Sequence, residues 1–142
     1  MRHRKNAIKL NRTTAHRRCL IANMLKSLIE HGRIETTVAK GKVLKRYADQ
    51  MVTLAKANSL ASKRRAIAEL MIRYNTLTTK EARAAKEGDT SGYNSDRKVI
   101  NILFNEIGPR FQTRHGGYTR LIKMDRRQGD NAQNCIVEYL SA

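Results

Sequence analysis

The 142-residue chain has no tryptophan, one proline and two cysteines, and only 5% of its residues are aromatic. Its longest uncharged apolar run, Cys19 to Leu25, is far shorter than the ~20 residues that a membrane-spanning helix needs. Basic residues from Lys5 to Arg18 interrupt the apolar stretch that a secretory signal would require, so we expect a cytoplasmic protein. An organelle transit peptide is the alternative, but the basic start runs directly into a predicted helix.

Residues arranged for catalysis or metal binding are also scarce. Cys19 and Cys135 show no Cys-x-x-Cys spacing, which favours a reduced, packed thiol over a disulfide or a zinc ligand. There are no paired carboxylates, phosphate-binding glycine loops or clusters of metal ligands. Three of the four histidines lack a nearby carboxylate to orient the ring, and His31 falls in the last turn of a predicted helix. We therefore expect no enzyme, no cofactor, no metal and no small-molecule substrate, with a small nuclease using His16 or His115 as the catalytic alternative.

Acidic residues are outnumbered, because 29 Lys and Arg face 12 Asp and Glu and leave a formal net charge of +17. Such an excess requires anions to neutralise it, and guanidinium and ammonium groups pair well with phosphates. Nucleic acid is thus the expected partner, with a DNA-compacting role and a membrane lipid or other acidic surface as alternatives. No carboxylate precedes Glu30, whereas the basic residues before it are Arg2, Arg4, Lys5, Lys9, Arg12, Arg17, Arg18 and Lys26.

A second basic cluster lies near the C-terminus and is diluted only by Asp125. It consists of Arg110, Arg114, Arg120, Lys123, Arg126 and Arg127. Within it, Gly116 and Gly117 would let the backbone approach RNA closely, and Tyr118 could stack on an unpaired base. The alternative is a plain loop with Tyr118 in the core and Phe111 as its anchor. With no aromatic pair at sheet spacing, recognition of RNA shape is favoured over sequence-specific reading of single strands.

The clearest predicted helix follows the basic start. Thr13 or Thr14 can cap it, and paired apolar residues repeat every four positions until Gly32, which should end it in a left-handed conformation. Residues 33–38 alternate as a short strand, and Thr37 can cap a second helix over about 39–56. The predicted inner side of this second helix is Val43, Tyr47, Met51 and Leu54, and its other face carries Lys40, Lys42, Lys45, Arg46 and Lys56.

Two further helices are predicted, over about 60–74 and over 95–107. The first would bury Ile67, Leu70, Met71 and Tyr74, and the second would be capped by Ser95 and stopped by Gly108 and Pro109. Between them, Thr78 and Glu81 fit a capping box for a short polar helix that ends near Gly88. Its charges are nearly balanced and it has almost no apolar face, so we interpret residues 74–94 as a surface excursion.

The last two predicted elements are strands over 118–124 and 134–140, joined across Gly129, Asp130 and Asn131. Three short strands with grouped helices indicate a two-layer α+β fold, in which a small antiparallel sheet is covered by helices. We expect one domain over residues 13–142. Residues 1–12 have too few apolar side chains to offset the cost of ordering and are predicted to be an extended basic tail that orders on binding.

Several short motifs, in a fixed order, are shared with one known family. The most specific are Gly108-Pro109-Arg110-Phe111 and Gly116-Gly117-Tyr118-Thr119-Arg120; the others are MRHRK at the start, Leu10-Asn11-Arg12, His16-Arg17, Thr36-Thr37, Thr53-Leu54-Ala55-Lys56 and Gly129-Asp130-Asn131-Ala132. From Met1 to the last strand the sequence resembles the bacterial large-subunit ribosomal protein seventeen family. Two features depart from it: Gly41 replaces a better helix former, and residues 74–94 are absent from the shorter members.

The resemblance implies a structural constituent of the large ribosomal subunit, bound to large-subunit ribosomal RNA near the peptide exit tunnel and close to neighbouring ribosomal proteins. It implies RNA contacts for the tail residues Arg2, His3, Arg4, Lys5, Asn11, Arg12, His16 and Arg17, and for Arg110, Arg114, Arg120 and Lys123. The charge distribution adds Lys9, Arg18, Lys40, Lys42, Lys45, Arg46, Gly116, Gly117, Tyr118, Arg126 and Arg127 as candidates.

Overall fold

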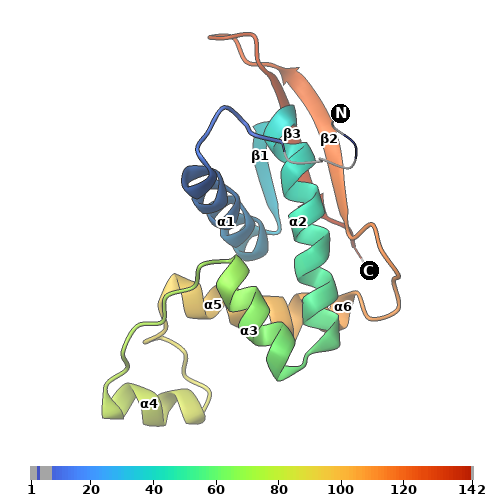
Figure 1. The fold of residues 1–142 in the computed structure, drawn as a ribbon. Helices are drawn as coiled ribbons and strands as arrows, with labels where there is room; N and C mark the ends of the chain where they lie inside the picture. Colours follow the sequence, from blue (N-terminus) through green and yellow to red (C-terminus); the bar gives the residue numbers. More distant parts are fainter. Residues whose placement is uncertain (1–2, 4–7, 142) are drawn as a thin grey trace.

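The scaffold of the molecule is a three-stranded antiparallel sheet with its long helices packed against one face (Figure 1). In the computed structural model, which describes residue 3 and residues 8–141, the strands are β1 (Arg33–Thr37), β2 (Thr119–Arg126) and β3 (Gln133–Tyr139). Their order is β1-β3-β2, and Val137 at the centre pairs with Ile34 on one side and Leu121 on the other. The predicted α+β class with a small antiparallel sheet is confirmed.

Two long helices supply most of the core. They are α1 (Thr14–His31) and α2 (Val38–Ala57), and α1 ends at Gly32 with φ 73°, as predicted. Thr13 and Thr37 occupy the predicted N-cap positions, but neither side chain accepts a capping hydrogen bond. Within the described part of the chain, no helix has both the length and the apolar character that a membrane crossing requires.

The buried side of α2 is rotated relative to the sequence prediction. Leu44, Ala48 and Met51 are fully buried against α1 and the sheet, whereas Tyr47 and Leu54 are only half-buried. Each large side chain removed from water contributes roughly 1.5–3 kcal/mol of stabilisation. The rotation turns Tyr47 toward the α1 side of the helix, where it borders a groove described below.

Gly41 lies within α2, at its closest approach to the sheet. A Cβ built there would stand 2.6 Å from Cys135 Sγ, 3.0 Å from Leu121 Cδ1 and 3.2 Å from Val137 Cγ2. The helix starts at Val38 despite the glycine, because this close packing compensates for the weak helix propensity of glycine. Cys135 is a buried free thiol, as predicted for a packed cysteine, and Cys19 is an exposed one.

The third helix is shorter than predicted. α3 (Leu60–Glu69) is capped by Ser59 and ends before Met71, which adopts a left-handed conformation with φ 51°. Lys26 Nζ donates to Met71 O at 3.4 Å, and Cys19 Sγ lies 3.8 Å from Met71 Sδ, so contacts with α1 stabilise this turn. No glycine or proline marks this turn in the sequence, so the end of the helix could not be predicted correctly.

The predicted stop at Gly108 and Pro109 is wrong. α5 (Ser95–Ile102) continues into a π-helical turn, η1 (Leu103–Ile107), and then into the short α6 (Gly108–Arg110). Pro109 occupies the first turn of α6, where a missing N–H is tolerated. Gly108 has helical dihedrals, and a Cβ there would lie 3.1 Å from Ala55 O of α2, so the glycine permits close packing of helices. The cap of α5 is Asn94 rather than Ser95, since Asn94 Oδ1 accepts from Arg97 N at 3.0 Å.

Residues 74–94 project from the helical layer as a loop that carries α4 (Thr79–Lys86) (Figure 1). The predicted capping box of Thr78 and Glu81 is present, and no residue of α4 is buried. Tyr74 does not pack in the core as predicted; it is 45% exposed, and the Arg97 guanidinium lies 4.8 Å from its ring centroid and 5.3 Å from that of Tyr93. Arg97 also donates to Asn75 Oδ1 and Asn75 O.

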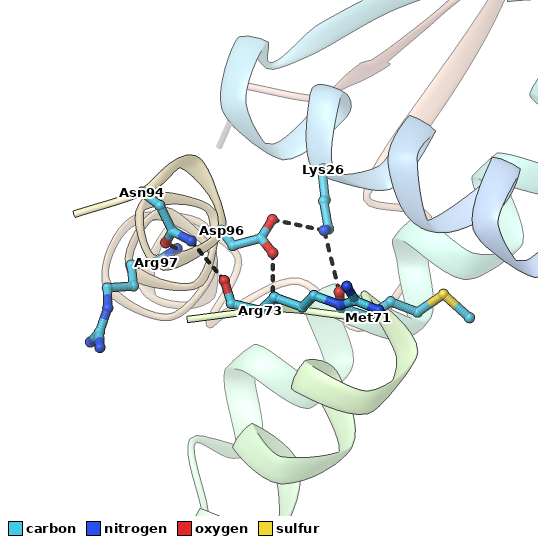
Figure 2. Close-up of polar contacts among 6 residues, drawn as sticks. All are labelled: Lys26, Met71, Arg73, Asn94, Asp96 and Arg97. Carbon is cyan, nitrogen blue, oxygen red and sulfur yellow. Dashed lines mark hydrogen bonds and ion pairs between the residues drawn. The ribbon is translucent and has the colours of Figure 1, made fainter. Parts of the chain in front are cut away.

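Both ends of this excursion are fastened to α1 through Asp96 (Figure 2). Lys26 Nζ of α1 donates to Asp96 Oδ1 at 2.7 Å, and Arg73 N donates to Asp96 Oδ2 at 2.6 Å. Asn94 Nδ2 donates to Arg73 O at 2.7 Å and closes the link between the two ends. Burial raises the pKa of Asp96, but the hydrogen bonds from Lys26 and Arg73 outweigh it and leave the pKa below its usual value.

Candidate nucleic-acid interface

The segment before α1 forms a turn that packs on the domain. Arg12 N donates to Lys9 O at 3.2 Å, Leu10 is half-buried against the core, and Leu10 and Asn11 have positive φ angles. Leu10 thus gives residues 8–12 an apolar anchor on the domain, and the basic tail over residues 1–12 that orders on binding stays a prediction. Arg2, Arg4 and Lys5 lie outside the described residues, and His3 is exposed.

Basic side chains gather around the first turns of α1. Arg12 Nη1 lies 3.1 Å from His16 Nε2, and Arg17 Nη1 donates to Arg12 O at 3.5 Å. Arg18 and Lys9 are exposed beside them. Because His16 contacts an arginine instead of a carboxylate, the geometry does not orient its imidazole as a general base.

The first turns of α2 carry the second predicted basic group. Lys42 and Arg46 are exposed, and Lys40 and Lys45 are half-buried. Among the described residues, none of these four forms a side-chain hydrogen bond or an ion pair, nor do the arginines at the start of α1 pair with any carboxylate. We call these basic residues of the two helices the α1–α2 basic surface; its members are Arg12, His16, Arg17, Arg18, Lys40, Lys42, Lys45 and Arg46.

A groove between the two helices joins these groups, which the sequence places more than twenty positions apart. It has a volume of about 280 Å³ and is lined by Arg17 and Ile21 of α1, by Val43, Arg46, Tyr47 and Gln50 of α2, and by Ile8. We call it the α1–α2 groove. The sequence prediction missed Gln50 and assigned Tyr47 to the core. The sequence feature that could have revealed the groove is the spacing of residues 43, 46, 47 and 50. This spacing places an apolar, a cationic, an aromatic and an amide side chain along one side of a helix.

The C-terminal basic cluster is divided between two ends of the molecule. Lys123, Arg126 and Arg127 belong to the β2–β3 hairpin, which extends past the start of α2, whereas Arg110 and Arg114 lie near the far end of α2 (Figure 1). Lys56 near the end of α2 donates to Arg114 O at 2.6 Å, which fixes the second location. The hairpin residues therefore extend the α1–α2 basic surface, and the loop residues form a separate site.

Several members of this cluster already have partners within the chain. Arg120 pairs with Glu138, Arg127 pairs with Asp130 at 2.5 Å, and Arg110 donates to Leu140 O. The hydrogen bond from Arg127 is the main cause that lowers the pKa of Asp130 to about 2. Lys123 and Arg126 are exposed and form no side-chain hydrogen bond or ion pair among the described residues. These two are the hairpin cations most available to an external anion.

The glycine-rich loop and Tyr118 have different roles. Gly116 (φ 146°) and Gly117 (φ 59°) adopt backbone conformations that other residues rarely do, and both are exposed. Tyr118 is only 4% exposed, its ring centroid lies 5.3 Å from that of Phe111, and Lys56 Nζ donates to its hydroxyl at 3.3 Å. The core alternative is confirmed for Tyr118 and Phe111, and a base-stacking role for Tyr118 does not fit this burial.

No group of three or more His, Cys, Asp or Glu side chains in the described part of the chain is arranged to hold a metal ion. His115 is exposed in the loop before Gly116, and Arg114 Nε donates to Gly116 O at 3.1 Å beside it. The arrangement that the structure does supply is a set of cations around a partly apolar groove. Such a surface can neutralise phosphates and bury a flat, partly apolar group.

Comparisons with known proteins find relatives over almost the whole chain. Residues 20–140 match the family described as Ribosomal protein L17. The chain is 65% identical over 141 residues to the large ribosomal subunit protein bL17 of Protochlamydia amoebophila, with 99% of both chains covered. It is 61% identical to the protein of the same name from Chlamydia abortus, also with 99% of both chains covered, and 59% identical to that of Chlamydia pneumoniae, with 100% covered.

Proposed function

The chain belongs to the ribosomal protein L17 family, and we propose that it binds large-subunit ribosomal RNA through phosphate contacts and supports subunit assembly and architecture near the peptide exit tunnel. It acts there as a non-catalytic structural constituent of the large ribosomal subunit, in the cytoplasm and next to neighbouring ribosomal proteins. The tail residues Arg2, His3, Arg4 and Lys5 are part of this proposal.

The proposal rests on the α1–α2 basic surface, which forms no ion pair with any residue that the structure describes. Its cations come from two helices held together by a shared core, so their spacing is fixed before any partner binds. A polyanion that meets such a surface releases its counterions without first breaking internal ion pairs. Arg120 and Arg127, by contrast, would each exchange a carboxylate for a phosphate.

The salt dependence of binding tests the proposal. If the full chain neutralises about eight phosphates of large-subunit ribosomal RNA, the logarithm of affinity should fall with the logarithm of salt with a slope of roughly 6 to 7. Replacing Lys42 or Arg46 by alanine should reduce that slope by about 0.7 to 0.9 each. Lys86→Ala, which removes an exposed cation of the excursion, should leave it unchanged.

A flat salt response, or an equal loss of slope for Lys42→Ala and Lys86→Ala, would contradict the proposal. Cosedimentation with large subunits in a sucrose gradient gives an independent readout and should persist until high salt. Equal affinity for duplex DNA without cosedimentation would indicate a DNA-compacting protein instead.

A further inference from the structure

The α1–α2 groove has a composition that phosphate binding alone does not explain. Phosphate contacts need cations at an exposed surface, but Ile21 and Val43 are buried side chains that also line this groove. Ile8, which is 41% exposed, adds a third apolar side chain. An apolar floor under a basic rim fits a ligand that is flat and apolar on its faces and attached to a phosphate chain.

Three polar side chains that line the groove have no hydrogen-bond partner among the described residues, whereas Arg17 donates to Arg12 O. Among the described residues, the side chains of Arg46, Tyr47 and Gln50 form no hydrogen bond with another residue, although all three line the same space. Binding pockets typically combine apolar walls with a few convergent polar groups that fix the ligand's orientation. Gln50 offers both a donor and an acceptor, the pattern needed to bind the hydrogen-bonding edge of a base.

We propose that the α1–α2 groove receives one unpaired base of large-subunit ribosomal RNA. The base lies against Tyr47 over the floor of Ile21 and Val43, and the Gln50 amide hydrogen-bonds its edge. Arg17 and Arg46 pair with the phosphates on either side of the flipped nucleotide. Unpaired bases stacked on aromatic side chains are the usual means by which proteins recognise a position in folded RNA. This inference rests on the proposed function and names the contact that gives it a defined position on the RNA.

Charge distinguishes this occupant from a protein side chain. Among the residues that the structure describes, no carboxylate lines the α1–α2 groove, and its two arginines favour a ligand that carries negative charge. A neighbouring hollow of about 270 Å³ shares Arg17, Ile21 and Tyr47 and also has two arginines, because Arg18 lines it. It includes the Glu69 carboxylate, however, so its net positive charge is smaller than that of the α1–α2 groove. The nucleotide therefore enters from the side of Ile8 and Gln50. The volume of about 280 Å³ is just below the ~300 Å³ at which sites for drug-sized ligands begin, consistent with a single base.

Base-specific and backbone-specific probing of protein-free large-subunit ribosomal RNA, with and without the full chain, tests the inference. Dimethyl sulfate reports unpaired adenine and cytosine, a carbodiimide reports unpaired uracil and guanine, and hydroxyl radicals report the backbone. The wild-type chain should protect one unpaired base within its backbone footprint. Gln50→Ala and Tyr47→Leu should restore the reactivity of that base. Tyr47→Leu should also weaken binding by about tenfold, the usual effect of losing one base–aromatic stack.

Controls separate this inference from the proposed function and from misfolding. Asn105→Ala removes an exposed amide of η1, away from the groove, and should leave the base protection and the affinity at the wild-type level. Gln50→Ala breaks no hydrogen bond within the described chain, so its unfolding temperature should match that of the wild type. If the backbone footprint is present but no base protection depends on Tyr47 or Gln50, the base assignment is wrong while the proposed function stands. If the side chains that line the groove are shielded from hydroxyl radicals only when other ribosomal proteins are present, the occupant of the groove is a protein. That result also overturns the assignment.

Discussion

Gly41 of α2 and Cys135 of β3 approach each other so closely that a methyl group on Gly41 would stand 2.6 Å from Cys135 Sγ. This contact sets the distance between the helical layer and the sheet. Leu121 of β2 and Val137 of β3 also lie against Gly41. The position of α2 on the sheet in turn determines where Lys42, Arg46 and the α1–α2 groove lie. One glycine therefore connects the packing of the core to the candidate RNA interface.

We expect Gly41→Ala to destabilise the protein. Overpacking of a core contact typically costs about 1–3 kcal/mol, and the better helix propensity of alanine offsets about 1 kcal/mol of that. The net loss should be up to about 2 kcal/mol, measured by chemical denaturation. The double variant Gly41→Ala/Cys135→Ala should lose less stability than the sum of the two single variants, because removing Sγ relieves the shortest contact.

Gly129→Ala is the control, since a Cβ at Gly129 meets nothing within 4 Å. Equal losses of stability for the two glycine variants would contradict this account.

The difference between sequence prediction and structure is clearest at the glycines and at Met71. Three features that depend only on neighbouring residues were predicted correctly: the helix end at Gly32, the Thr78–Glu81 capping box and the β2–β3 turn. Gly41 and Gly108 serve contacts with segments distant in the sequence. Local rules therefore predicted a helix stop at Gly108, and Gly41 stood out only as a departure from the family pattern. Met71 turns the chain because Lys26 and Cys19 of α1 hold it, and no local motif encodes that.

The candidate site shows the same limit. Charge alone identified the basic groups of α1 and α2, because an excess of cations is visible in composition. The α1–α2 groove could not be predicted, because it exists only where Arg17 and Tyr47 are brought together by the core. The internal ion pairs of Arg120 and Arg127 were also missed. The pairing of Arg120 with Glu138 depends on the β2–β3 register, and that of Arg127 with Asp130 on the shape of the turn.

The Lys26–Asp96 pair should make stability depend on acid pH. The pKa of Asp96 is lowered in the folded protein, so the carboxylate contributes stability above its usual pKa of 3.8. That contribution is lost as the pH falls through the lowered folded pKa. Asp96→Asn should cost about 1–3 kcal/mol at neutral pH, because Lys26 and Arg73 N lose a charged acceptor, and its stability should converge with that of the wild type in acid.

Thermal unfolding from neutral to acid pH measures this effect, with Glu87→Gln as the exposed control. Hydrogen exchange of residues 72–97 should also accelerate in Asp96→Asn, since Asp96 fastens both ends of the excursion to α1. A constant difference between the variant and the wild type at every pH would show that the charge of Asp96 is not responsible.

Removal of the carboxylate at Asp130 should strengthen RNA binding. Asp130 pairs with Arg127 on the exposed hairpin, and such surface pairs contribute only ~0.2–1 kcal/mol. Asp130→Asn should retain an acceptor for Ala132 N, which donates to Asp130 Oδ1 at 3.2 Å, while it releases Arg127. We expect a roughly two- to fivefold gain in affinity for large-subunit ribosomal RNA at low salt. Asp89→Asn on the excursion removes the same charge elsewhere; an equal gain would reflect net charge alone and contradict a role for the hairpin.

Substitutions at Tyr118 separate a core role from a base-stacking role. Its ring is buried against Phe111 and its hydroxyl accepts from Lys56, so Tyr118→Ala should lose about 3–5 kcal/mol of stability, and Tyr118→Phe about 1 kcal/mol. Tyr118→Leu keeps an apolar side chain but removes the aromatic face. If the ring only packs in the core, Tyr118→Leu should lower the unfolding temperature but bind ribosomal RNA with wild-type affinity under conditions where it is folded. A folded Tyr118→Leu that binds about tenfold more weakly would instead show that the ring leaves the core and stacks on RNA.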